Sequence, residues 1–508
     1  MIKLNIIANY IGQAWVTLLG ILFIPYYIKI LGVEAYGVIS FITSLQILLT
    51  VLDLGITISL NREFSKFNYS NGFRFELGEL LRSVEALFFC ISALVVLGFF
   101  LASMVSNNIF ETEQYTVGQM RGFLNVAGFL VALRLIEGIY KSCLVGMQMQ
   151  IKVNALNVLM STFRHFGAIG ILVALDSTVE VYLFWQVFIS IITVIIFGIN
   201  VYRSLSLGFL QSKFSIIYLT KTFNFAFGVM AMSVLSLFLT SVDKLFLVKF
   251  VSLKEYSEYM LAMTLAAGLN SFVGPIVQAT FPRLCQLRED KSVSQYGAVF
   301  HMASQLTCVL VSSVGAVIFF NADEIMLLWT QDDALVTTVA PLLKIIVLGT
   351  ILNCLTWMPF QALLSYGLSG YVAKINLVSL FFVLPVFYFL VDLFGVKGAA
   401  YTWLFYNLVY FIFGSYFAIN RSVRFEFQTW LFSDTLFPLM GSFGLTAILV
   451  YFNIFDLVDY WDIINYLCFS FFFALLGAVI FANNFRYYLY FGLLLSWKKF
   501  FSIFVRSR

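Results

Sequence analysis

Apolar stretches of about 20 residues, each bounded by charged or turn residues, recur from one end of this chain to the other. Of its 508 residues, 61% are hydrophobic and 11% are charged, whereas a soluble domain carries about 25% charged residues. A helix of about 20 apolar residues can cross a bilayer, because it satisfies its own backbone hydrogen bonds where no water is present. The sequence therefore predicts an all-α integral membrane protein that crosses the bilayer many times.

Fourteen membrane spans are predicted from these runs. The span over 335–358 has the weakest signal, because Pro341 and Lys344 interrupt it. The predicted limits are 6–30, 36–59, 83–106, 120–140, 154–175, 181–202, 222–249, 256–281, 298–320, 335–358, 372–394, 397–419, 434–455 and 462–482.

The distribution of lysine and arginine predicts the orientation, because short cytoplasmic loops are enriched in both. With the N-terminus in the cytoplasm, 21 of the 30 basic residues fall in inside segments, five fall outside and four fall within spans. Acidic residues such as Asp323 and Asp332 lean to the outside. One missed span would invert every later loop and remove this asymmetry. We therefore expect both termini on the cytoplasmic side.

An internal repeat accompanies this topology. The segment YIKILGVEAYGVISFITSL, from Tyr27, resembles LVKFVSLKEYSEYMLAMTL, from Leu247, so that Lys29 aligns with Lys249 and Tyr36 with Tyr256, both at an offset of 220. Six spans separate the copies, which gives them the same orientation, as in transporters built from two parallel bundles with a cavity between them. We predict an N-terminal six-helix lobe, a C-terminal six-helix lobe, an appendage of helices 13 and 14, and a cytoplasmic interfacial amphipathic tail, over 1–203, 204–424, 425–484 and 485–508 respectively.

Charged residues inside the spans are the candidate functional residues, because each costs roughly 2.5–3.5 kcal/mol on insertion scales. Arg134, Glu137 and Lys141 are spaced to share one helix face. Arg134 and Glu137 can pair and merely brace two helices, but Arg164 has no acidic neighbour within a turn of its own helix. A carboxylate from another helix, such as Asp53, would balance it, and so would a substrate phosphate, which arginine binds bidentately.

The other in-span charges have structural alternatives. Asp53 is suited either to hold a coupling proton or sodium ion or to cap and brace helices. Lys244 and Lys344 lie near outer span ends and can snorkel to the interface, which leaves Asp243 on the cavity side. The candidate cavity cations are Arg134, Arg164, Lys344, Lys244 and Lys141, and the candidates for ion coupling or charge balance are Asp53, Glu137 and Asp243.

The six cysteines form no Cys-x-x-Cys motif or Cys/His cluster, so no metal site is indicated.

The segment from Pro25 to Lys66, with LGVEAYG at Leu31, LDLG at Leu52 and NRE at Asn61, resembles the polysaccharide-transporter and O-antigen flippase branch of the multidrug/oligosaccharidyl-lipid/polysaccharide exporter superfamily. Two further segments match the same family more weakly, SVDKLFL at Ser241 and GPIVQATFPRL at Gly274. The resemblance implies a MATE-like fold with fourteen helices in two six-helix lobes around a central cavity. It also implies alternating access, in a bacterial inner membrane, that moves an undecaprenyl-diphosphate-linked oligosaccharide to the outer leaflet. The cavity arginines of the related lipid II flippases have no convincing match in spans 1 and 2.

Two other functions compete with this one. A cation-coupled multidrug exporter would need an acidic cavity, whereas the in-span charges singled out above give four basic against three acidic residues. A membrane enzyme of polysaccharide assembly would need a sizeable outer loop and a catalytic constellation, and the longest predicted outer loops, about 107–119 and 321–334, are short. We therefore expect a flippase rather than an enzyme, with no cofactor beyond a coupled H⁺ or Na⁺. Its expected partners are the lipid-linked oligosaccharide, membrane lipid, and polysaccharide polymerase and chain-length proteins, and no nucleic acid.

Overall fold

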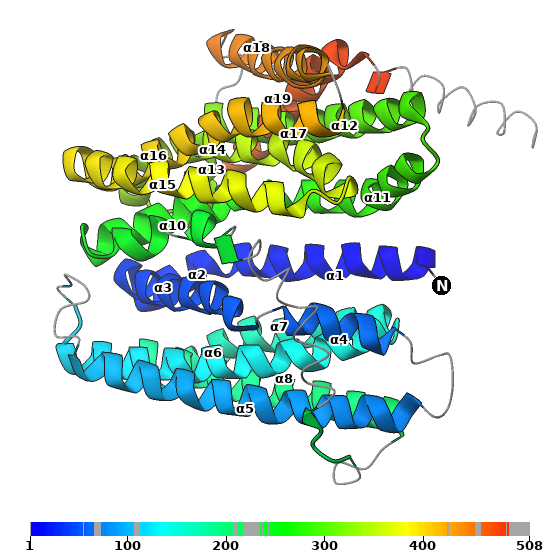
Figure 1. Cartoon of the computed structure of the whole chain (residues 1–508). Helices are drawn as coiled ribbons and strands as arrows, with labels where there is room; N and C mark the ends of the chain where they lie inside the picture. The colour runs from blue at the N-terminus through cyan, green and yellow to red at the C-terminus, as the bar shows by residue number, and fades with distance from the viewer. Residues whose placement is uncertain are drawn as a thin grey trace, which may run out of the picture. The chain divides into compact units, whose positions relative to one another are not determined.

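The structure is a computed structural model of the whole chain, shown in Figure 1. It describes residues 2–53, 55–65, 73–105, 112, 114–206, 212–216, 234–235, 237–241, 243–423, 426–452, 459–483 and 485–486. Nearly all of these residues are helical, as expected for a chain that must satisfy its backbone hydrogen bonds within a bilayer.

Thirteen helical segments in the described part of the chain are long and apolar enough to cross a membrane. Each overlaps one of the predicted spans, so the prediction of an all-α, multi-pass membrane protein is confirmed. Half of the remaining predicted span, 222–249, lies outside the described ranges, and so do all but the first two residues of the interfacial tail predicted for 485–508.

The chain forms two compact units, residues 1–260 and 261–508. In the first unit, α6 packs against α3, α4, α5 and α8, while α1 packs against α7 (Figure 1). Its buried core is formed by aliphatic and aromatic side chains of α4, α5, α6 and α8. The helices are α1 (Ile2–Leu22), α2 (Ile24–Leu31), α3 (Val33–Leu49), α4 (Ile56–Phe64), α5 (Phe73–Val105), α6 (Val117–Gly146), α7 (Gln150–Ala174), α8 (Val179–Leu205) and the first part of α10 (Leu253–Ala267).

The second predicted span, 36–59, is interrupted rather than continuous. A short 3-10 turn, η1 (Thr50–Asp53), follows α3, and Gly55 adopts a left-handed backbone conformation with φ of 74° before α4 begins. Only glycine takes this conformation without steric cost, so the LDLG sequence ends one helix and starts another. The break places Asp53 at the N-terminal end of α4.

The repeat seen in the sequence also appears in the helix boundaries. Helix α3 begins at Val33 and α10 begins at Leu253, which is the same offset of 220 that relates Tyr36 to Tyr256. Each tyrosine is buried and lies in the first turn of its helix. The two segments therefore share local structure as well as sequence.

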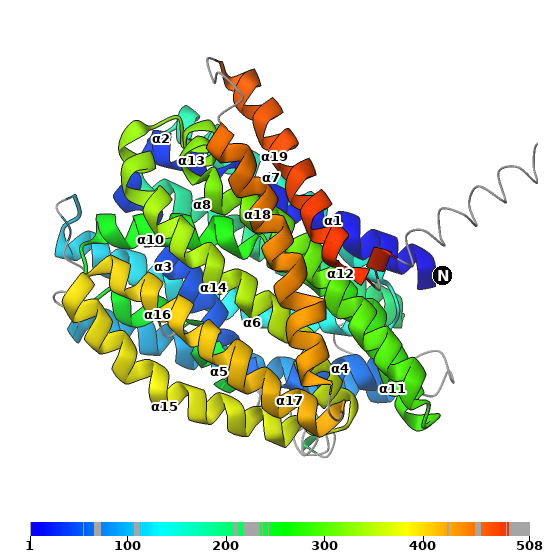
Figure 2. The same cartoon turned by 90° about the horizontal axis from the view of Figure 1, so that it is seen from above.

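In the second unit, α12 and α14 pack against each other and contact most of the remaining helices. Helices α18 and α19, the predicted appendage, lie side by side in Figure 2, and both pack against α12. The elements are the rest of α10, α11 (Asn270–Glu289), α12 (Val293–Phe320), α13 (Ala322–Thr330), α14 (Asp333–Ser365), α15 (Ser369–Phe394), α16 (Val396–Val409), the π-helical η2 (Tyr410–Gly414), α17 (Ser415–Ser422), the π-helical η3 (Thr429–Leu436), α18 (Phe437–Phe452) and α19 (Tyr460–Phe481).

Candidate functional site

The charged stripe predicted on α6 is present. Glu137 forms an ion pair with Lys141, one turn further along the helix, and its Oε1 lies 3.5 Å from Arg134 Nη1. The Glu137 side chain is only 4% exposed, whereas that of Arg134 is 54% exposed. A buried carboxylate thus serves two cations, one on each side of it along the helix.

Lys141 has a second partner on another helix. Its Nζ lies 5.1 Å from the centre of the Phe197 ring on α8, within the distance at which an ammonium interacts with an aromatic face. The ion pair and the ring together hold Lys141 in place between α6 and α8.

Arg164 on α7 has a weaker set of partners. Its Nη1 donates a hydrogen bond of 3.3 Å to Oε1 of Gln186 on α8. In the part of the chain that the structure describes, no carboxylate lies within ion-pair distance of this guanidinium. Its backbone carbonyl accepts a 3.1 Å hydrogen bond from Trp185 Nε1. Neighbouring residues thus hold Arg164 in position, but no carboxylate among the described residues pairs with its guanidinium.

Asp53, the carboxylate proposed as an alternative partner of Arg164, binds elsewhere. Its two oxygens accept hydrogen bonds from the backbone N–H of Thr57 at 3.1 Å and from Thr57 Oγ1 at 2.5 Å. This contact caps α4 at its N-terminal end, where an anionic side chain is stabilised by the exposed N–H groups. The sequence leaves two roles open for Asp53, ion coupling and helix capping, and the structure shows the contact of a helix cap.

We call Arg134, Glu137, Lys141 and Arg164 the cationic cluster. Glu137 pairs with Arg134 and Lys141, and Arg164 lies close enough to Glu137 and Arg134 to feel the charge of both. A surplus of positive charge within a membrane bundle needs an anion or water to balance it. This arrangement is suited to binding a dianionic group such as a diphosphate.

His165 follows Arg164 and packs against aromatic rings. Its Nδ1 lies 2.9 Å from the hydroxyl oxygen of Tyr27, and its ring centre is 5.3 Å from that of Phe23. Tyr27 in turn contacts Tyr182 with ring centres 5.1 Å apart. His165 therefore occupies a polar packing position next to Arg164.

Asp243 and Lys244 contact each other, contrary to the expectation that they have separate surroundings. Lys244 Nζ lies 3.3 Å from Asp243 Oδ1, and Asp243 Oδ2 accepts a 2.6 Å hydrogen bond from Tyr259. Adjacent side chains point about 100° apart on a helix, but a lysine side chain is long enough to reach back. Asp243 is thus bound on both of its oxygens.

Lys344 belongs to the second unit and has a carboxylate partner of its own. Its Nζ donates to Asp323 Oδ2 on α13 at a distance of 2.5 Å. The two side chains are 36% and 51% exposed. Lys344 is therefore neutralised locally, by a carboxylate of its own unit.

Glu85 and Asp434 are among the buried carboxylates that the sequence reasoning missed. Glu85 on α5 is 1% exposed and accepts hydrogen bonds of 2.8 Å from both Tyr140 and Tyr202, while Arg82 lies 3.3 Å away. Asp434 in η3 is completely buried. Both fall inside predicted span limits, as do Glu258 and Asp392, so counting every acidic residue within those limits would have found them. The basic excess is therefore local to the cationic cluster and does not extend to all spans.

Asp434 belongs to a polar network that we call the His301 network. His301 Nδ1 pairs with Asp434 Oδ2, and His301 Nε2 lies 3.6 Å from Glu426. Gln305 donates to Asp434 Oδ1 at 2.9 Å and accepts from the backbone N–H of Phe485 at 3.0 Å. The network links α12, η3 and the residues after α19 within the second unit.

The comparisons with known proteins agree with this architecture. The sequence profile of the polysaccharide biosynthesis protein family matches residues 2–288. A Shigella flexneri protein named for O-antigen transport is 22% identical over 404 residues, which cover 78% of this chain and 93% of that protein.

Among solved structures, the lipid II flippase MurJ in an inward closed conformation superposes with a TM-score of 0.69 at 14% identity, covering 95% of this chain and 99% of that one. An inward-facing multidrug resistance MATE family transporter of the MOP superfamily gives a TM-score of 0.67 at 12% identity, with 82% and 94% of the chains covered. At these identities the likeness shows the fold, and it confirms the MATE-like architecture predicted from the sequence.

Proposed function

The chain belongs to the polysaccharide biosynthesis protein family, and from this premise we propose that it is a flippase for an undecaprenyl-diphosphate-linked oligosaccharide repeat unit. It moves this lipid from the cytoplasmic to the outer leaflet of a bacterial inner membrane, for the synthesis of O-antigen, capsule or exopolysaccharide. The two predicted six-helix lobes alternate between an inward-open and an outward-open arrangement, and both termini stay in the cytoplasm.

The observation that supports this proposal is the cationic cluster. Arg164 is fixed by its neighbours but has only the neutral amide of Gln186 as a described side-chain partner. A guanidinium carries five N–H donors in a planar fork, which matches the oxygen atoms of a phosphate. A diphosphate would supply the negative charge that the single carboxylate of Glu137 does not.

The five candidate cavity cations receive different roles in this proposal. Arg134 and Arg164 bind the diphosphate, and Lys141 keeps Glu137 in position between them. Lys244 and Lys344 each contact a carboxylate, Asp243 and Asp323 respectively. We therefore assign these two lysines to the stability of their own segments.

Ion coupling remains a prediction that rests on the acidic residues. Asp53 and Asp243 are both bound through two oxygens, so either one would have to leave its partner to take up H⁺ or Na⁺. Glu137 can exchange partners more readily, because a bound diphosphate competes with it for Arg134. We propose that Glu137 provides charge balance in the empty state.

Substitution of Arg164 tests the proposal. In a strain that lacks the native gene, Arg164→Ala should reduce surface polysaccharide at least tenfold, because the diphosphate loses its fork-shaped ligand. Arg164→Lys should restore only part of the activity, since an ammonium cannot bind two oxygens in a fixed plane. Polysaccharide is measured by gel and immunoblot, and protein in the membrane by quantitative blotting.

Arg203→Ala is the matched control, because Arg203 is an exposed arginine at the end of α8. It should leave polysaccharide unchanged. Normal polysaccharide from Arg164→Ala, at normal protein level, would refute the substrate-binding role of the cluster.

A further inference from the structure

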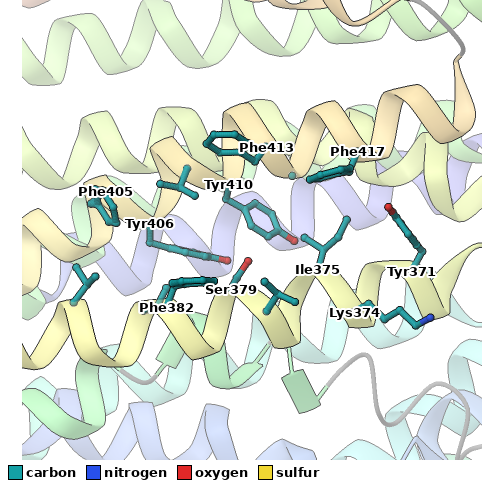
Figure 3. Close-up of a pocket in the computed structure, with 15 residues that line it drawn as sticks. Tyr371, Lys374, Ile375, Ser379, Phe382, Phe405, Tyr406, Tyr410, Phe413 and Phe417 are labelled. Carbon is teal, nitrogen blue, oxygen red and sulfur yellow. The ribbon is translucent and has the colours of Figure 1, made fainter.

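A long groove with an apolar lining runs along the second unit between α15 and the α16–α17 pair. Its volume is about 660 Å³, within the range of sites that bind small molecules. Figure 3 shows Ile375, Ser379 and Phe382 on one wall and Tyr406 and Tyr410 on the other. The groove is open at the surface of the second unit, because Phe382 and Phe413 on its two walls are 69% and 58% exposed.

The length of the groove exceeds that of one leaflet. Its lining residues on α15 extend from Tyr371 to Val386, which corresponds to about 22 Å at 1.5 Å per residue. The hydrocarbon core of a bilayer is about 30 Å thick, so one leaflet contributes about 15 Å. A phospholipid acyl chain anchored at the interface would fill only part of the groove, whereas a longer polyprenyl chain would fill all of it.

Among the described residues that line or border the groove, positive charge gathers at one end. Of its fifteen lining residues, Lys374 alone is charged, and it lies in the first two turns of α15. Arg421, in the last turn of α17, places its guanidinium 4.8 Å from the ring centre of Tyr371 at that same end. An apolar channel with two cations at one end complements a lipid with an anionic head and a long tail.

We propose that this groove binds the polyprenyl chain of the lipid-linked substrate, with Lys374 and Arg421 contacting its diphosphate. The inference rests on the proposed function, because it takes the substrate to be a polyprenyl diphosphate. The groove is a second lipid site, at which the polyprenyl tail lies along α15. It belongs to the second unit, whereas the cationic cluster belongs to the first. The wall that contains Tyr410 is preorganised for this, since Tyr410 donates a 2.6 Å hydrogen bond to the buried Asn376 and stacks on Phe360.

Binding of undecaprenyl diphosphate to the full chain in lipid nanodiscs tests the proposal. Ser379→Trp fills the groove and should weaken binding at the groove site at least tenfold, and Lys374→Gln should weaken it there severalfold, while binding at the cationic cluster stays unchanged. Leu377→Trp is the matched control on α15, because Leu377 is 53% exposed and does not line the groove. Lys397→Gln, at the start of α16 near the opposite end of the helix pair, is the control for charge.

The outcomes separate this inference from the proposed function. If the unmodified protein fails to bind undecaprenyl diphosphate, the proposed function fails. If it binds, but Ser379→Trp binds equally well, the groove inference alone is overturned. Equal competition by dioleoyl phosphatidylglycerol at the same concentration would also overturn it, because the groove would then be a site for ordinary phospholipid.

A second measurement does not depend on the variants folding. Undecaprenyl diphosphate with a diazirine in its polyprenyl chain is photo-crosslinked to the unmodified protein, and the labelled peptides are identified by mass spectrometry. Labels on 371–386 or 405–417 support the groove. Labels confined to other helices contradict it.

Discussion

The cationic cluster and the His301 network are both polar groups within the membrane-spanning part of the chain, but their charges are balanced differently. In the His301 network, the buried carboxylate of Asp434 has a histidine on one oxygen and an amide donor on the other. In the cationic cluster, the single carboxylate of Glu137 pairs with Arg134 and Lys141, and Arg164 has only a neutral partner among the described side chains. The His301 network fits a structural role, because its polar groups find their partners within the protein. The surplus positive charge of the cationic cluster, by contrast, can be balanced by an anionic ligand.

The largest expected effect comes from breaking the balanced network. Asp434→Ala leaves His301 and Gln305 without their buried acceptor, and loss of one partner of a buried ionic pair costs about 3–5 kcal/mol. The amount of folded protein in the membrane should fall sharply, as measured by quantitative blotting and by thermal unfolding in detergent. Thermal stability within error of the unmodified protein would show that the network is not structural.

Glu137→Gln in the cationic cluster should have a smaller effect, and this effect is a gain in anion affinity rather than a loss of folded protein. Among the described residues, Glu137 is the only carboxylate that pairs with these cations, so its removal should raise the affinity for an anion. Inorganic pyrophosphate, which has no lipid tail, should bind severalfold more tightly, and the gain should shrink as salt is added, because salt screens the charges. Calorimetric titration measures this, and weaker binding than in the unmodified protein would argue against Glu137 as a competitor of the substrate.

The smallest effect is expected from Lys344→Gln. Its pair with Asp323 is substantially exposed, and exposed pairs contribute about 0–1 kcal/mol. Surface polysaccharide and thermal stability should both stay close to those of the unmodified protein. A loss of polysaccharide as large as that of Arg164→Ala would return Lys344 to the substrate site.

The sequence was sufficient for features that depend on local periodicity. The thirteen described spans follow from hydropathy because the bilayer requires a long apolar helix for each crossing. The contacts of Glu137 with Arg134 and Lys141 follow from helical spacing, since residues three and four apart lie on one face. Membership of the family also follows from local patterns, such as LGVEAYG and LDLG near the N-terminus.

Features that depend on packing between distant segments were not predictable in the same way. His301 and Asp434 are 133 residues apart, and nothing in either segment specifies the partner. The capping role of Asp53 depends on the left-handed conformation of Gly55, which breaks a span that hydropathy alone presents as continuous. The groove likewise requires α15 to lie against α16 and α17 at a particular spacing.

The central claim is that the positive surplus around Arg164 binds the diphosphate of the substrate. The most direct measurement is the affinity of the purified full chain for inorganic pyrophosphate, compared between the unmodified protein, Arg164→Gln and the control Arg203→Gln. We expect Arg164→Gln to weaken binding at least tenfold and Arg203→Gln to leave it unchanged. Equal affinities in all three proteins would contradict the claim.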